Sequence, residues 1–158
     1  MRTWRAGLPL PLSSGVSCAR SVAVSWDVFV QDLPQGIGSV EEIPDDFEPS
    51  SIGLRSRVGS TIRRLYPETI AESDAWLTLA ISGCSLEVNL GDGEQLSGFS
   101  FHVRGGESAP VVIAHILRTL GLRALDPSSD TGLFDEEAAS KSLAKWEAHR
   151  DAVLYKHS

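Results

Sequence analysis

Three polar residues alternate along one predicted strand, at Ser100, His102 and Arg104, so their side chains are expected on the same face of a sheet. Glu87 and Asn89 alternate in the same way on the strand before it. A serine, a histidine and an acidic residue on one face are the types that hydrolases use as nucleophile, base and orienting group. A histidine beside an arginine is also suited to holding a small anion.

The spacing of these residues argues against a hydrolase. Ser100 and His102 are two residues apart on one strand, which separates them by about 6–7 Å, too far for a direct nucleophile–base hydrogen bond unless the strand bends. The sequence around Ser100 also lacks the G-x-S-x-G turn between a strand and a helix. We therefore predict no catalytic residues, and His102 and Arg104 are candidates for binding a partner. The alternatives are an ordinary wetted face and a small enzyme that acts on an anionic small molecule there.

A second candidate surface is the acidic stretch at residues 45–48. It consists of Asp45, Asp46, Phe47 and Glu48. Carboxylates around one aromatic anchor suit docking onto a basic patch of another protein. The same composition also suits a surface loop that is fixed by a single phenylalanine.

The charge of the chain limits the classes of partner. The net charge is −7, but the first 24 residues carry Arg2, Arg5 and Arg20 and no acidic residue, which leaves −10 for residues 25–158. Because nucleic acids and anionic membranes are bound by clustered Lys and Arg, neither is predicted as a partner. A basic protein is the predicted partner, since complementary fields speed association. Alternatively, the charge serves only solubility.

No cofactor or metal site is predicted. The four histidines show no i, i+4 pair, and the two cysteines show no C-x-x-C spacing; they are His102, His115, His149 and His157, with Cys18 and Cys84. The glycine-rich, acidic residues 91–94 are most simply a hairpin turn. Asp126 and Asp130 are able to bind a cation, although the simpler interpretation is that Asp126 caps its own turn.

The strands that position these residues are read from alternating apolar and polar positions. We expect strands at 25–33, 75–82, 85–90 and 98–104, and a short one at 122–125. In the two middle strands the apolar positions are Leu86, Val88 and Leu90, and Phe99, Phe101 and Val103. One apolar and one polar face is typical of an antiparallel sheet. The sequence therefore predicts that Phe101 points inward while Ser100, His102 and Arg104 are wet.

Helical spacing predicts the remaining elements. Ser39 and Glu42 have capping-box spacing at a short helical turn, and residues 54–65 fit a short helix. A helix at 108–120, capped by Ser108 and ended by Gly121, is expected to cover the apolar face. A final helix at 135–155 should dock through Trp146. The predicted fold is α+β, with an antiparallel sheet of four to five strands and helices packed mainly on one face.

Residues 1–24 read as a segment outside the domain, and residues 25–158 as one domain. The segment has a basic start and an apolar middle like a secretory signal, but Pro9, Pro11 and Arg20 interrupt that pattern. It is alternatively an upstream extension before a true start at Val24, or a disordered tail. The domain is expected in the cytoplasm, or in the periplasm if residues 1–23 are a signal peptide; no membrane-spanning stretch is predicted.

Several segments resemble a group of small uncharacterised bacterial proteins of about this domain's length. The segments are WDVFVQDLP at 26–34, IPDDF at 43–47, HVRGG at 102–106, LGLRALD at 120–126 and Thr131-Gly132. The resemblance covers roughly residues 24–151. The ending through Phe134 is also similar to that of some immunity proteins of bacterial toxin systems. The resemblance assigns no functional residues. Small size, strong acidity and the absence of a catalytic constellation predict a non-enzymatic binding protein, immunity-like in neutralising a basic partner.

Overall fold

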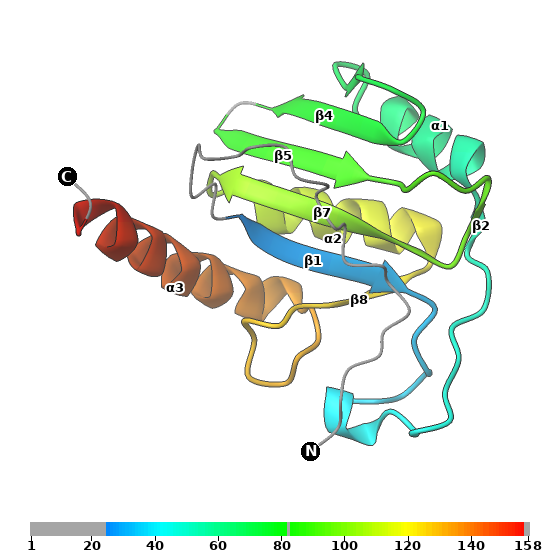
Figure 1. Cartoon of the computed structure of the whole chain (residues 1–158), viewed down its shortest axis with the longest axis horizontal. Coiled ribbons are helices and arrows are strands. Elements are labelled where there is room, and N and C mark those ends of the chain that lie inside the picture. The colour runs from blue at the N-terminus through cyan, green and yellow to red at the C-terminus, as the bar shows by residue number, and fades with distance from the viewer. Residues whose placement is uncertain (1–24, 82, 157–158) are drawn as a thin grey trace.

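The computed structural model describes residues 25–81 and 83–156, so the expectations for residues 1–24 lie outside the described part of the chain. Eight strands and four helices follow one another along it (Figure 1). They are β1 (Trp26–Gln31), η1 (Val40–Glu42), β2 (Gly53–Leu54), α1 (Arg55–Leu65), β3 (Ile70–Ala71), β4 (Trp76–Ile81), β5 (Cys84–Asn89), β6 (Gln95–Leu96), β7 (Gly98–Gly105), α2 (Ala109–Leu120), β8 (Arg123–Leu125) and α3 (Glu136–Tyr155).

The main sheet has six strands in the order β3-β4-β5-β7-β1-β8, and neighbouring strands are antiparallel. A separate two-stranded ribbon pairs β2 with β6. The α+β class is confirmed, although the sheet has more than the expected four to five strands. The additional strand, β3, is two residues long, and alternation cannot be recognised over so short a stretch.

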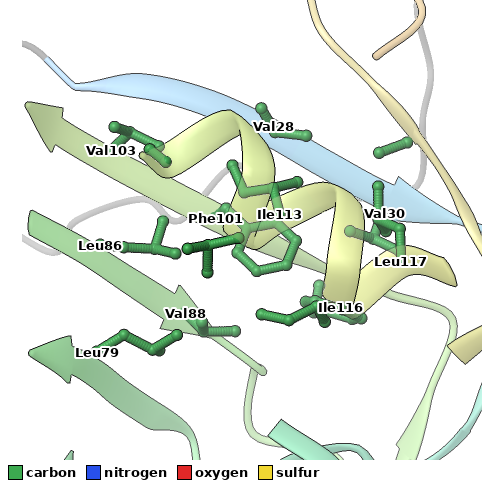
Figure 2. Packing of buried hydrophobic residues seen from close by; sticks show 14 of the residues in the cluster. Val28, Val30, Leu79, Leu86, Val88, Phe101, Val103, Ile113, Ile116 and Leu117 are labelled. Carbon is green, nitrogen blue, oxygen red and sulfur yellow. The ribbon is translucent and has the colours of Figure 1, made fainter. Parts of the chain in front are cut away.

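The apolar face of the sheet is covered by α2, as expected. Figure 2 shows Ile113, Ile116 and Leu117 of α2 above Phe101 and Val88 of the sheet. These five side chains are buried. Burying each such side chain contributes about 1.5–3 kcal/mol before the entropy of folding is subtracted. This face therefore holds the main core, and the opposite face of the sheet remains for other roles.

The C-terminal end of α2 is fixed by the conformation of one glycine. Gly121 has a φ of 68°, and its N–H bonds back to the carbonyls of Leu117 and Arg118, so it ends the helix as predicted.

Ser108 lies at the N-cap position but, contrary to expectation, its side chain does not cap the helix. It hydrogen-bonds to Cys84 instead. Burial raises the pKa of the Cys84 thiol, and the contact with Ser108 partly opposes that rise.

The other two long helices lie beside α2, α1 at the β4 end and α3 at the β1 end (Figure 1). α3 docks through Ala139, Leu143 and Trp146, which are buried, as the sequence predicts for Trp146. Arg150 stacks on the Trp146 ring and donates to the Arg104 carbonyl. Among the described residues no helix is long and apolar enough to cross a bilayer.

Candidate functional site

The structure separates the candidate residues into two surfaces. His102 and Arg104 lie on β7, on the sheet face opposite α2; we call this the polar sheet face, with Asp27, Trp76, Glu87 and Ser100 as its other members. The second surface, which we call the acidic segment, is residues 41–48. It begins within η1, which packs at the β8 edge of the sheet. Since β1 lies between β7 and β8, the two surfaces are neighbours rather than one site.

Strand register aligns three ionisable side chains across the polar sheet face. His102 is opposite Glu87 of β5 on one side and opposite Asp27 of β1 on the other. Phe101, between Ser100 and His102, is fully buried beneath α2. The expected register, with Phe101 inward and His102 outward, is therefore confirmed.

A hydrogen-bonded chain runs through Ser100, His102 and Asp27. The Ser100 hydroxyl is 3.2 Å from His102 Nε2, and His102 Nδ1 is 2.8 Å from Asp27 Oδ1. The expectation that Ser100 and His102 are too far apart is wrong. Strand spacing sets the distance between the two Cα atoms, whereas the imidazole extends far enough along the same face to reach the hydroxyl. The serine is thus joined to Nε2 and the carboxylate to Nδ1, which is the connectivity of a serine–histidine–aspartate triad.

The chain is less exposed than expected. Ser100 has only 8% of its surface exposed, so the prediction that it is wet is wrong. It is a small side chain between Asn89 and Phe29 in the register, and these larger neighbours shield it. The His102 side chain is 15% exposed, because the Trp76 ring stacks nearly parallel to its imidazole at 5.7 Å between centroids. The hydrogen bonds to Ser100 and Asp27 and the stacked Trp76 ring therefore hold the imidazole in place.

Arg104 is paired within the same face. Its guanidinium contacts Glu87 Oε2 at 3.3 Å, and about half of its side chain is exposed. The ion pair offsets the charge that Arg104 would present to an anion. An anionic ligand would have to replace Glu87 as the partner of Arg104.

The position of Ser100 within the sheet limits acyl-transfer chemistry. β7 is paired with β5 on one side and β1 on the other, so the backbone N–H groups around Ser100 belong to the ladder. Stabilising an oxyanion requires donors aimed at the developing charge. The polar sheet face therefore supplies a base and a hydroxyl, while side chains such as Arg104 would have to supply the anion contact.

The start of the acidic segment is anchored to the body of the protein. Val40 and Ile43 pack on the smaller cluster formed by Leu33, Leu125 and Leu133, and the Val40 N–H bonds to the Thr131 carbonyl at 2.9 Å. The cap is a variant of the expected capping box. The Ser39 hydroxyl accepts from the N–H of Glu41, and the Glu42 carboxylate accepts from Gly38 rather than from Ser39. The carboxylates that follow therefore start from a fixed backbone.

Residues 32–48 contain six acidic residues and no Lys or Arg. The nearby Arg123 donates to the carbonyls of Pro34 and Ile37 at 3.2 and 2.9 Å, so its charge is directed to the backbone. Asp45, Asp46 and Glu48 are exposed, and Phe47 is half-buried. The negative field of this surface is thus opposed by few local cations.

Comparisons with protein-family models, with curated proteins and with solved structures found no match to this chain. Function must therefore be argued from the two surfaces themselves.

Sequence reasoning missed two members of the polar sheet face, Asp27 and Trp76. Each lies on the expected strand, but their proximity to His102 depends on which strands are neighbours. Asp27 is 75 residues from His102 in the chain, and no local pattern links them. Alternation with apolar residues predicts the sheet face on which each side chain lies. Contact with His102 follows only from the order of the strands. Among the described residues, no three His, Cys, Asp or Glu side chains are grouped to hold a metal ion.

Proposed function

We propose that this protein acts by binding, holding a basic protein partner against the acidic segment. The observation that carries the proposal is the concentration of carboxylates in residues 32–48 without any Lys or Arg, on a backbone fixed by the smaller apolar cluster. A prearranged surface loses little conformational entropy on binding, which favours affinity. Phe47 supplies the apolar anchor that charged residues alone would lack.

The resemblance to immunity proteins suggests the class of partner. A basic toxin domain that acts on a nucleic acid needs its cations free to contact phosphate. An acidic surface that covers those cations would block the contact without any catalytic step. The immunity-like role rests on this complementarity of charge.

Site-directed photocrosslinking in cells of the source organism tests the binding proposal. Phe47 is replaced by p-benzoylphenylalanine in the full chain, and ultraviolet light then fixes whatever protein lies within reach of that position. We expect an adduct with a basic protein. The adduct should fall at least tenfold when Asp45, Asp46 and Glu48 are changed to Lys, because the partner's cations then meet like charges.

The matched control changes Glu68, Glu72 and Asp74 to Lys. These three exposed acids lie around β3, at the opposite edge of the sheet, and their substitution alters the net charge by the same amount. The control should retain the adduct. An adduct with an acidic protein, no adduct at all, or equal loss in both triple variants would each refute the binding proposal.

A second function is favoured by the Ser100–His102–Asp27 chain. The connectivity supports a small hydrolase in which Ser100 is the nucleophile, His102 takes its proton at Nε2, and Asp27 holds the imidazole through Nδ1. Arg104 would hold an anionic substrate. This alternative requires Arg104 to leave Glu87 when the substrate binds.

Labelling with a fluorophosphonate separates the second function from the first. An active serine displaces fluoride from the phosphorus, forming an Oγ–P bond while the serine proton moves to His102 Nε2. A working triad predicts a covalent adduct at Ser100 that is lost in S100A and slowed at least a hundredfold in H102Q. An unlabelled Ser100, in a protein that still forms the crosslink at position 47, would leave binding as the function.

A further inference from the structure

The helix α1 is strongly basic within an acidic protein. It carries Arg55, Arg57, Arg63 and Arg64 and no acidic residue, whereas the chain as a whole has a net charge of −7. Arg55 is already engaged, since it contacts Glu94 and donates to the carbonyls of Gly91 and Asp92. The other three arginines are exposed.

A surface cavity of about 470 Å³ lies between α1, β2 and the C-terminal end of α2. Its polar lining includes the side chains of Arg57, Ser60 and Arg64. Its apolar lining includes Leu54, Val58 and Leu120, of which Val58 is buried and Leu54 is unusually exposed for a leucine. Cavities of about 300–1,000 Å³ are the size that small-molecule ligands occupy.

Helix geometry brings the two arginines to the same side of the cavity. Arg57 and Arg64 are seven residues apart, which is close to two turns and about 10 Å along the axis. Ser60 lies between them on the same stripe. Arg63, the neighbour of Arg64, does not line the cavity.

Within residues 25–81 and 83–156, neither Arg57 nor Arg64 is paired with an acidic side chain. Arg104 and Arg118, by contrast, are both in ion pairs. Two arginines without a carboxylate partner, next to exposed apolar side chains, combine the contacts that recognise a molecule with an anionic group and an apolar body.

We propose that this cavity binds an amphipathic small anion, with its carboxylate, phosphate or sulfonate on Arg57 or Arg64 and its apolar body on Leu54, Val58 and Leu120. The cavity is lined by α1, β2 and the end of α2, whereas the acidic segment packs at the β8 edge of the sheet, so the two proposed sites use different surfaces.

The direct probe is 8-anilinonaphthalene-1-sulfonate, which joins an aromatic body to one sulfonate. Its fluorescence is titrated with the full-length protein. We expect saturable binding that is weakened at least tenfold by R57Q/R64Q. The matched control is R63Q/K156Q, which loses the same charge at exposed residues outside the cavity and should bind like the unsubstituted protein.

The neutral analogue N-phenyl-1-naphthylamine tests the role of the anionic group. It should bind more weakly than the sulfonate and should not respond to R57Q/R64Q. Displacement of the sulfonate probe by octanoate or by octyl phosphate supports the proposal, and their order of potency identifies the preferred head group. Equal binding by both double variants, no saturable binding by the unsubstituted protein, or displacement by neither competitor would overturn it.

Discussion

Asp126 joins two distant segments of the chain through one carboxylate. Its Oδ1 accepts hydrogen bonds from the Trp26 indole at 3.0 Å, from the Ser128 N–H at 3.0 Å and from the Ser128 hydroxyl at 2.6 Å. The bonds to Ser128 confirm the expectation that Asp126 caps its own turn. The bond to Trp26 spans 100 residues, and a local pattern holds no information on it. Asp126 is only 1% exposed and Trp26 2%, so the indole has little water available as a substitute.

Replacing Asp126 by Ala should destabilise the protein by about 2–4 kcal/mol, because it leaves the buried Trp26 indole and the part-buried Ser128 N–H without their acceptor. Urea unfolding followed by tryptophan fluorescence measures the change. D130A is the control: Asp130 is in the same loop, its side chain is 95% exposed, and it makes only a surface ion pair with Lys145. That control should cost less than about 0.5 kcal/mol. Equal losses in the two variants would contradict the role given to Asp126.

At the level of elements, the sequence predicted those whose apolar spacing extends over several residues. β5 and β7 were found because Leu86 and Val88, and Phe99 and Phe101, alternate with polar residues; α2 was found because Ile113, Ile116 and Leu117 follow helical spacing. β2, β3 and β6 have two residues each, which is too short to show a period. The strand order was also hidden, since the pairing of β1 with β7 depends on contacts between distant segments.

The same division applies to the candidate site. The direction in which His102 points follows from alternation, and the structure confirms it. Its bond to Asp27 and its stacking on Trp76 follow from strand order, which places β1 and β4 on the two sides of the β5–β7 pair. Individual positions on a face can thus be predicted from local sequence, whereas the chemical groups assembled there require the tertiary fold.

Gly106 connects β7 to the start of α2 at a point of close backbone approach. Its φ is 112°, and a Cβ on it would overlap the carbonyl oxygen of Gly83 and the Cα of Cys84. Both the conformation and the space therefore require glycine.

We expect G106A to lower the free energy of unfolding by more than about 3 kcal/mol, because β5 must move away from the turn. Thermal and urea unfolding give the measurement. G121A is the matched control: Gly121 also has a positive φ, but no atom lies within 4 Å of its added Cβ, so only the conformational cost of about 1 kcal/mol applies. If G106A were no worse than G121A, the close approach would not be the reason for the glycine.

On the scale of the whole molecule, charge is segregated. The acidic segment lies at the β8 end of the sheet, whereas the unpaired arginines of α1 lie toward the β4 end (Figure 1). The net charge of −7 nevertheless produces overall self-repulsion in the folded state. Salt screens charges on the surface, with a Debye length of about 30 Å at 0.01 M and about 8 Å at 0.15 M.

The thermal midpoint should therefore rise by about 2–6 °C between 0.01 and 0.15 M NaCl at pH 7, which corresponds to about 1 kcal/mol for a chain of this size. Scanning calorimetry measures the shift. At pH 5, near the isoelectric point, the same addition of salt should change the midpoint much less. A midpoint that falls with salt at pH 7 would mean that attractive ion pairs outweigh the repulsion.

The place of β1 between β7 and β8 has a consequence for how the chain is made. The ribosome produces residues 26–31 before either of their ladder partners, which end at Val103 on β7 and at Leu125 on β8. At about 5–20 residues per second, several seconds separate the birth of this strand from that of its first neighbour. During that interval Val28 and Val30 have no partner strand, so the nascent chain carries an exposed apolar segment with unpaired backbone groups, which is prone to aggregate. β1 therefore cannot join the sheet until residues 98–103 of β7 have been made.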